Sequence, residues 1–403
     1  MRDTRAFRGP EPIASKIRIG RFLFIHFFTS SRASLVPAPR STLARRRLCH
    51  ARTPKQAPMS HFASPYAAEL VATARALAAP GKGILAADES TGTIGKRLGS
   101  IGVENTEANR QALRELLFTA PGFETRCSGV IMFEETLGQS CADGVSFVDL
   151  LTSRGIIPGI KVDKGVTVIP GLEARGETTT AGLDGLEMRC ADFYEKGARF
   201  AKWRGVLTVG PEKDGPSRLC LSENASALAR YAAVCQKTGL VPIVEPEILT
   251  DGDHDVEVSQ KVTERVLQTV FAELHAHGVM MEGMILKPNM VTSGIGAKIK
   301  ASSDVVAAKT VECLRRVVPP AVPGILFLSG GQTEVEATEH LNKMNVLSKK
   351  QNPNPWTLSF SYGRALQASV LTAWRGDPAN KAAAQKALLE RADANGKASL
   401  GEL

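Results

Sequence analysis

The sequence lacks any uninterrupted run of about 18 apolar residues, the length that an α-helix needs to cross a bilayer. We therefore expect no membrane-spanning segment. The seven cysteines are scattered, with no Cys-x-x-Cys pair or other spacing typical of a metal site, so they are expected to be reduced and mostly buried thiols in a reducing compartment. The Gly-x-Gly-x-x-Gly fingerprint of dinucleotide-binding folds is also absent, which disfavours an open doubly wound sheet.

Acidic residues are nearly missing from the first 58 residues. This segment holds 13 Lys and Arg against only Asp3 and Glu11, a surplus of 11 positive charges. Because the whole chain carries +9, the rest carries about −2, and no nucleic-acid partner is expected. Residues 1–58 resemble a basic, disordered transit peptide, which would place the protein in a plastid. Alternatively, translation starts at Met59 and the protein is cytoplasmic; in both cases residues 59–403 form the folded part.

From residue 63 onward, short apolar segments alternate with amphipathic helical segments. Such alternation predicts parallel strands joined by helices, and eight strand-then-helix units are the number that closes a (β/α)₈ TIM barrel. We therefore predict an α/β fold with a single barrel domain, an N-terminal extension and a C-terminal helix. An open doubly wound sheet is the alternative. The eight predicted strands span residues 83–90, 128–135, 156–165, 200–210, 241–249, 280–290, 324–331 and 357–363.

Charged residues recur where these strands end. In a TIM barrel the active site lies at the carboxyl ends of the strands. One such residue alone is more often a solvated loop charge, but their recurrence at the same end of nearly every strand predicts a catalytic face. The strand-end residues are Asp88, Glu89, Glu134, Glu135, Lys161, Asp163, Lys164, Lys202, Arg204, Glu245, Glu247, Lys287, Ser329, Gly330, Gly331, Gly363 and Arg364.

Lys287 closes an apolar strand, Met284 to Leu286, and Pro288 follows it directly. A lysine here could extend its amine to solvent. Alternatively, a desolvated lysine beside another cation such as Lys202 could lose its proton and attack a carbonyl to form a Schiff base. The resulting iminium is an electron sink that permits a nearby carbon–carbon bond to break or form.

Carboxylates are available for the proton transfers of such a reaction. Glu245 or Glu247 could move protons to and from the carbinolamine, and Asp88 could accept the hydroxyl proton as the bond breaks.

Glycines and arginines after the last two strands predict a phosphate site, since barrel phosphate sites commonly form there. Arg97 and Arg110, on the helical segment after the first strand, could hold a second anion. The residues predicted for the first phosphate are Ser329, Gly330, Gly363 and Arg364.

Seven motifs taken together resemble the class I fructose-bisphosphate aldolase family over about residues 62–398. The resemblance implies a Schiff base at Lys287, general acid–base catalysis at Glu245 with Glu247 and Lys202 assisting, and a role for Asp88 in carbon–carbon cleavage. The motifs are GILAADESTGTIGKRL, GIKVDKG, FAKWR, VPIVEPEIL, LKPNMV, FLSGGQ and SFSYGRALQ.

The resemblance also implies a substrate and an assembly. Lys161 and Arg204 would contact the sugar, and Ser329, Gly330, Gly363 and Arg364 would bind one phosphate. The other phosphate would lie near Ser90, Thr93, Arg97 and Arg110. The implied reaction is reversible cleavage of fructose 1,6-bisphosphate to dihydroxyacetone phosphate and glyceraldehyde 3-phosphate. It would serve glycolysis and gluconeogenesis, or the Calvin cycle in a plastid, in a homotetramer without a metal or other cofactor.

The chain departs from the family in one respect. Members normally carry a flexible C-terminal tail ending in tyrosine that aids proton exchange on the enamine, whereas this sequence ends in Gly-Glu-Leu, so that step is expected to be slow. The motifs are closest to the cytosolic plant and algal form.

Three other functions are alternatives. A metal-dependent aldolase would need a histidine cluster, and the sequence has none. A transaldolase-like enzyme would need one phosphate site rather than two, and a non-catalytic scaffold would be expected to have lost Lys287 or Glu245.

Overall fold

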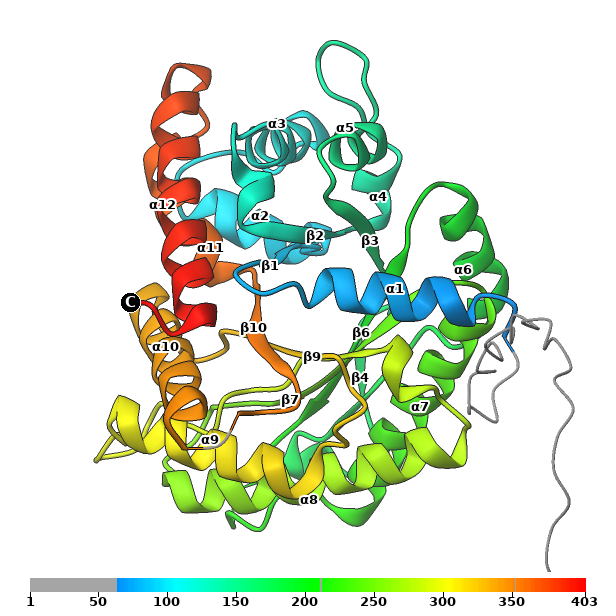
Figure 1. Ribbon diagram of the computed structural model, residues 1–403, viewed down its shortest axis with the longest axis vertical. Helices are drawn as coiled ribbons and strands as arrows, with labels where there is room; N and C mark the ends of the chain where they lie inside the picture. The colour runs from blue at the N-terminus through cyan, green and yellow to red at the C-terminus, as the bar shows by residue number, and fades with distance from the viewer. Residues whose placement is uncertain (1–63, 211, 352) are drawn as a thin grey trace, which may run out of the picture. The chain divides into compact units, whose positions relative to one another are not determined.

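The computed structural model describes residues 64–210, 212–351 and 353–403 (Figure 1). In these residues eight strands form a closed barrel in the order β1-β10-β9-β8-β7-β6-β3-β2, and every neighbouring pair is parallel. The predicted α/β barrel is therefore confirmed. The barrel strands are β1 (Gly83–Ala87), β2 (Cys127–Met132), β3 (Ile157–Lys161), β6 (Phe200–Leu207), β7 (Val241–Ile248), β8 (Ile285–Leu286), β9 (Gly324–Phe327) and β10 (Thr357–Tyr362).

Helices surround the barrel, and α12 packs outside α10 and α11 (Figure 1). No helix in the described part of the chain is both long and apolar enough to cross a membrane. The helices are α1 (Ala67–Leu77), α2 (Thr91–Gly99), α3 (Glu107–Phe118), α4 (Glu134–Leu137), α5 (Phe147–Ser153), α6 (Leu186–Glu195), α7 (Arg218–Lys237), α8 (Val256–Ala276), α9 (Ser303–Val317), α10 (Glu334–Gln351), α11 (Arg364–Trp374) and α12 (Lys381–Leu400).

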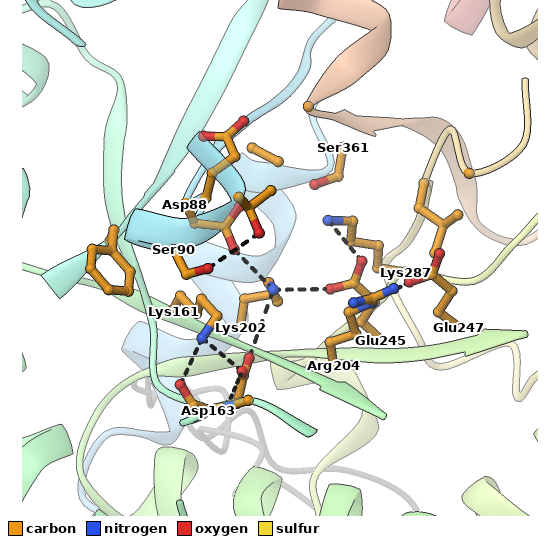
Figure 2. Close-up of a pocket in the computed structure, with 18 of the residues that line it drawn as sticks. Asp88, Ser90, Lys161, Asp163, Lys202, Arg204, Glu245, Glu247, Lys287 and Ser361 are labelled. Atoms are coloured by element: carbon orange, nitrogen blue, oxygen red, sulfur yellow. Dashed lines mark hydrogen bonds and ion pairs between the residues drawn. The ribbon is translucent and has the colours of Figure 1, made fainter. Parts of the chain in front are cut away.

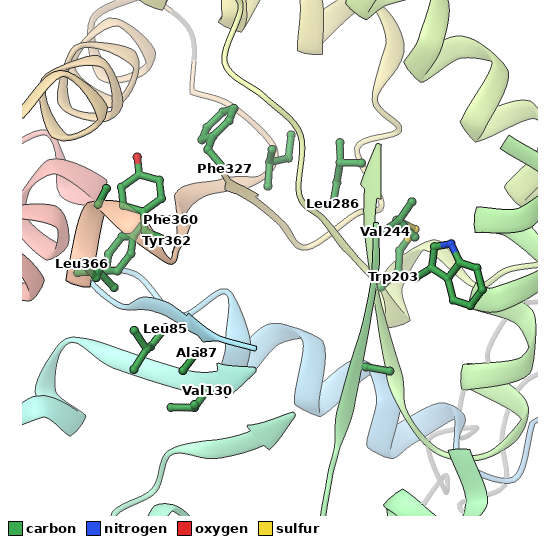
Figure 3. Close-up of a cluster of buried hydrophobic side chains, with 14 of the residues drawn as sticks. Leu85, Ala87, Val130, Trp203, Val244, Leu286, Phe327, Phe360, Tyr362 and Leu366 are labelled. Atoms are coloured by element: carbon green, nitrogen blue, oxygen red, sulfur yellow. The ribbon is translucent and has the colours of Figure 1, made fainter. Parts of the chain in front are cut away.

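Alternation along the strands divides the core into two layers. On β1, Ile84 belongs to a cluster inside the barrel, whereas Leu85 belongs to the larger cluster between the strands and the outer helices. Figure 3 shows part of the outer layer, including Leu85 and Trp203. Both faces of each strand are buried, which is why the strands read as nearly continuous apolar runs. Leu70 and Leu77 of α1 join the inner cluster.

The inner cluster contains one large aromatic ring, Phe200, which requires glycine on the neighbouring strand. A Cβ atom at Gly159 of β3 would lie 2.2 Å from the ring of Phe200 on β6. The side chain of Phe200 is fully buried. Glycine is therefore needed at residue 159 because the phenyl ring occupies the space of its missing side chain.

The predicted strands are too long at their carboxyl ends. The strand predicted over 128–135 ends at Met132, and Glu134 and Glu135 form the first turn of α4 instead. Acidic residues are favourable in the first turn of a helix because the amide groups there carry partial positive charge.

β8 is only two residues long, but the N–H of Lys287 still donates to the carbonyl of Val244 at 2.8 Å. This bond fixes the backbone at Lys287 beside β7.

The segment after β3, where no further strand was predicted, contains a small antiparallel hairpin. Its strands are β4 (Val166–Val168) and β5 (Thr178–Thr180). All three residues of β4 are exposed, so the sequence shows no alternation of buried and exposed positions to reveal the strand. The predicted leader and the start at Met59 lie outside the described residues.

Candidate active site

A cavity of about 820 Å³ opens at the carboxyl ends of the barrel strands (Figure 2). Of the residues to which the sequence assigned a catalytic or binding role, all except Arg110 line this cavity. The predicted residues that line the cavity are Asp88, Ser90, Thr93, Arg97, Lys161, Lys202, Arg204, Glu245, Glu247, Lys287, Ser329, Gly330, Gly363 and Arg364.

Arg110 does not line this cavity. It lies on α3 and pairs with Glu135, with Nη2 of Arg110 2.6 Å and Nε 2.8 Å from the carboxylate oxygens. This two-point hydrogen bond raises the pKa of Arg110 above its ordinary value. Its guanidinium is therefore held by a carboxylate outside the cavity, and binding of a second anion by Arg110 stays a prediction.

Lys287 lies directly after β8, and its side chain is 5% exposed. Its Nζ atom is 3.1 Å from Oε1 of Glu245, which is on the neighbouring strand β7. The backbone of Lys287 is tied to β7 on one side, and Pro288 follows it. The carbonyl of Pro288 accepts the N–H of Leu328 at 3.1 Å, so the chain on both sides of the lysine is fixed.

Lys202 on β6 lies among three carboxylates. Its Nζ atom is 2.9 Å from Oδ2 of Asp88, 3.4 Å from Oε2 of Glu245 and 3.8 Å from Oδ2 of Asp163. Burial alone would lower the pKa of Lys202, but the three carboxylates raise it above its ordinary value. Lys202 is therefore an ammonium ion buried at the centre of the site.

Asp88 follows β1 and is the carboxylate closest to Lys202. Burial would raise the pKa of Asp88, but the surrounding lysines, Lys202 first among them, lower it to about 2. Asp88 is therefore ionised at neutral pH. An ionised carboxylate can accept a proton from a bound hydroxyl group.

Arg204 and Glu247 form an ion pair between β6 and β7 at the side of the cavity. Burial would lower the pKa of Arg204, but the charge and hydrogen bond of Glu247 raise it. The glutamate also borders the loop after β9, because a Cβ atom at Gly330 would lie 3.0 Å from its Oε1 atom. A glycine at residue 330 thus allows that loop to approach Glu247 closely.

Two helices begin at the cavity wall. α2 starts after Ser90, whose hydroxyl lies 3.2 Å from that of Thr93, and α11 starts after Gly363. Helix N-termini carry free backbone N–H groups and partial positive charge, so both are suited to bind anions. Arg97 on α2 and Arg364 on α11 add positive charge to this wall of the cavity, where the two helices follow the neighbouring strands β1 and β10.

Glu89 is a buried residue beside the site whose role the sequence did not suggest. Its carboxylate pairs with Arg97 and lies 2.6 Å from Nη2 of Arg114 on α3. It also accepts a hydrogen bond of 3.0 Å from the amide of Gln367 on α11. Glu89 therefore connects the end of β1 with three helices, two of which begin at the cavity.

Asp163 is a strand-end residue to which the sequence assigned no role in the site. Its Oδ1 atom lies 2.7 Å from Nζ of Lys161, and the same ammonium donates to the backbone carbonyl of Asp163 at 2.7 Å. The two-residue spacing between Lys161 and Asp163 was the available signal. Ser361 on β10, which also lines the cavity, follows a buried strand pattern that gives no such signal.

No histidine of the described chain lines this cavity. His275 is in the last turn of α8, followed by His277 at its end, whereas His340 lies on α10 and its Nδ1 atom is 2.7 Å from Oε1 of Gln332. Among the described residues, no group of three or more His, Cys, Asp or Glu side chains is arranged to hold a metal ion.

Comparison with known proteins gives consistent matches. The family model described as "Glycolytic: Fructose-bisphosphate aldolase class-I" matches residues 69–403. Fructose-bisphosphate aldolase 5, cytosolic, from Arabidopsis thaliana is 59% identical over 344 residues, which cover 85% of this chain and 94% of the relative. Fructose-bisphosphate aldolase 1 from Toxoplasma gondii is 59% identical over 336 residues, or 83% of this chain and 91% of the relative.

A solved structure agrees with this assignment. The fructose-bisphosphate aldolase from Plasmodium falciparum, crystallised with TRAP and a small-molecule inhibitor, aligns with a TM-score of 0.81 and 53% sequence identity. The alignment covers 84% of this chain and 95% of that chain. The chain therefore belongs to the class I fructose-bisphosphate aldolases, and its activity is that of a fructose-bisphosphate aldolase of glycolysis.

Proposed function

We propose that this cavity cleaves fructose 1,6-bisphosphate reversibly through a Schiff base on Lys287. The observation that carries the proposal is the pair formed by Lys287 and Glu245, in which a buried amine lies 3.1 Å from a buried carboxylate at the catalytic end of a barrel. A nucleophilic lysine must lose a proton before it attacks a carbonyl, and a carboxylate at this distance can receive that proton.

Glu245 serves both lysines in this mechanism. Its Oε1 atom faces Lys287 and its Oε2 atom faces Lys202 at 3.4 Å. After attack on the ketone carbon, Glu245 returns a proton to the carbinolamine oxygen, which leaves as water as the iminium forms. The ammonium of Lys202 holds the carboxylate of Glu245 in place. Glu247 is fixed by Arg204 and borders the loop after β9.

Carbon–carbon cleavage then uses Asp88. The electron pair of the C3–C4 bond moves toward the iminium and forms the C2–C3 double bond of an enamine. The C4 hydroxyl transfers its proton to Asp88 and becomes the carbonyl of glyceraldehyde 3-phosphate. The low pKa of Asp88 keeps it ionised and ready for this step, and Lys202 stabilises the negative charge that develops on the oxygen.

Two phosphates are held at two sets of residues in the cavity wall. One binds the loop after β9 together with the start of α11, through Ser329, Gly330, Gly363 and Arg364. The other binds the start of α2 through Ser90 and Thr93, with Arg97 nearby. Lys161 and Arg204 contact the sugar between them. A substrate with a phosphate at each end is complementary to this distribution of helix N-termini and cations.

Replacing the nucleophile tests the mechanism. We expect Lys287→Met to reduce the kcat for fructose 1,6-bisphosphate cleavage by at least about 10⁴-fold, because a methionine cannot form an iminium. The matched control is Lys237→Met at the end of α7, whose lysine pairs with Glu187 on the surface. Near-normal cleavage by Lys287→Met, with the control also active, would contradict the proposal.

The same proposal extends to the assembly. We expect a homotetramer, as the family resemblance implies. From the chain mass of 43.1 kDa, four copies weigh about 172 kDa. Light scattering of the purified protein on a sizing column should give that mass, and a mass of one or two chains would contradict it.

For the compartment, we propose that the enzyme acts in the cytoplasm and that residues 59–403 contain the whole aldolase domain. Relatives from Arabidopsis thaliana and Spinacia oleracea bear the names of cytosolic or cytoplasmic isozymes. Chains beginning at Met1 and at Met59, each with a C-terminal fluorescent protein, should both remain in the cytoplasm. Import of the longer chain into a plastid would favour a transit peptide over residues 1–58.

A further inference from the structure

The two carboxylate oxygens of Asp163 have different surroundings. Oδ1 lies 2.7 Å from Nζ of Lys161 and accepts the N–H of Gly165 at 3.2 Å. Oδ2 is buried and has no hydrogen-bond donor among the described residues. A buried carboxylate oxygen without a hydrogen bond is costly in free energy, so one in an active site calls for a functional explanation.

This oxygen faces the central ammonium of the site, that of Lys202 (Figure 2). Oδ2 of Asp163 is 3.8 Å from Nζ of Lys202, which is beyond hydrogen-bond distance. The same ammonium is 2.9 Å from Asp88. Lys202 therefore has one close carboxylate and two at longer distances. Oε2 of Glu245 lies at 3.4 Å, but the other oxygen of Glu245 faces Lys287, whereas Oδ2 of Asp163 at 3.8 Å belongs to a carboxylate that is not engaged with the reacting lysine.

We propose that Asp163 is an alternative ion-pair partner of the Lys202 ammonium. Lys202 would move to Asp163 while Asp88 carries the proton that it has taken from the substrate. The proposal rests on the proposed function above. In that reaction the C4 hydroxyl proton moves to Asp88, while the C3–C4 electron pair becomes the enamine double bond. Asp88 is then neutral, and Lys202 has lost the charge of its closest partner.

Movement of the ammonium toward Oδ2 of Asp163 restores a close ion pair. The distance to close is the difference between 3.8 Å and the 2.9 Å of the present pair, which side-chain rotation of a lysine can supply. Lys161 and the N–H of Gly165 hold Oδ1, and this fixes Oδ2 toward Lys202. Asp163 is thus a positioning residue that keeps Lys202 charged and inside the site during cleavage.

The test uses Asp163→Asn, which preserves size and removes the charge. A hydrogen bond to a charged group contributes about 1.5–3 kcal/mol, so kcat for fructose 1,6-bisphosphate should fall by about 10- to 100-fold while KM changes by less than about twofold. Asp192→Asn on the outer face of α6, where the aspartate pairs with Lys196, is the matched control and should keep the wild-type kcat.

A separate readout distinguishes this inference from the proposed function. Borohydride reduction in the presence of dihydroxyacetone phosphate should trap the same fraction of Asp163→Asn as of the wild type, because Asp163 does not contact Lys287. Failure of the wild type to be trapped would overturn the Schiff-base mechanism. An unchanged kcat in Asp163→Asn, with trapping intact, would overturn only the role of Asp163.

A third comparison separates Lys202 from Lys161. If Asp163 acted only by holding Lys161, Lys161→Met would reproduce the kinetics of Asp163→Asn, and the double variant would be no worse than Lys161→Met. We expect instead a further loss of kcat in the double variant, about 10-fold or more. This variant removes both charges of a buried pair, so it is also the form to test if Asp163→Asn alone does not fold.

Discussion

Oε1 of Glu245 lies 3.1 Å from Nζ of Lys287, and both side chains are nearly inaccessible to solvent. The pair joins the ends of two adjacent barrel strands. The lysine supplies the nucleophile and the glutamate supplies a proton acceptor already in contact with it.

The first prediction concerns this contact. Glu245→Gln retains the shape of the side chain but cannot accept the proton of Lys287, so kcat should fall by about 10²- to 10⁴-fold. Glu195→Gln at the end of α6 is the control and should leave kcat unchanged. Steady-state cleavage assays on both variants measure the effect, and a loss smaller than about tenfold in Glu245→Gln would assign the proton transfer to another group.

The second prediction concerns stability and the buried carboxylate of Glu89. Glu89→Gln leaves the side chain of Arg114, which is only 3% exposed, without its counter-ion. Removing one partner of a buried ion pair typically costs about 3–5 kcal/mol, and we expect a loss of that size in the free energy of unfolding. Urea denaturation measures it.

A surface pair provides the control for Glu89. Glu134 and Lys164 form an ion pair in which both side chains are about half exposed. Glu134→Gln should therefore cost less than about 1 kcal/mol. Equal losses in Glu89→Gln and Glu134→Gln would show that burial of Glu89 does not determine its contribution.

The third prediction follows from the low pKa of Asp88. The pKa of Asp88 is about 2 in the folded chain, against an ordinary value of 3.8. The ionised carboxylate therefore stabilises the fold when the pH is above the pKa of the unfolded state. This contribution is lost as the pH falls through the pKa of the folded state. The shift corresponds to about 2 kcal/mol. Asp88→Asn lacks this titration, so the stability difference between wild type and variant should shrink by about that amount between pH 4 and pH 2.

Urea denaturation at several pH values between 2 and 5 measures this difference. A gap between wild type and Asp88→Asn that stays constant across the range would contradict the predicted titration of Asp88.

The fourth prediction concerns the loop after β9, which contains Gly330 and is proposed to bind a phosphate. A Cβ atom at Gly330 would lie 3.0 Å from Oε1 of Glu247 and 3.0 Å from Cδ1 of Leu328. Gly330→Ala should displace the loop and raise KM by about tenfold, because tight contacts of this kind cost about 1–3 kcal/mol to accommodate.

A second glycine serves as the matched control for the loop. At Gly138 the same addition meets only the carbonyl of Glu135 at 3.8 Å, an ordinary contact. Gly138→Ala should therefore leave KM unchanged. Similar KM values for the two alanine variants would contradict a binding role for the loop after β9.

Much of the fold was predictable because the barrel strands are buried on both faces. Their apolar runs, separated by helical segments, identify eight units without any knowledge of contacts. Strand β4 of the hairpin was not predicted because its residues Val166, Thr167 and Val168 are all exposed. Without a buried face there is no alternation for the sequence to display.

The site was predictable where it depends on strand ends and not where it depends on side-chain partners. Lys202 and Glu245 could be placed in one site because parallel strands in a barrel end on the same face. The pairing of Arg110 with Glu135, or of Glu89 with Arg114, depends on how α3 packs beside the barrel. These partners are 25 residues apart, and the sequence spacing carries no signal for them.

The central claim is that Lys287 forms the covalent bond to the substrate. The most direct test is borohydride reduction of the full chain with dihydroxyacetone phosphate in the presence of EDTA, followed by intact mass and peptide mapping. We predict one reduced adduct per chain, located on Lys287 and unaffected by the chelator. An adduct on a different lysine, or full cleavage activity with no adduct at all, would contradict the account.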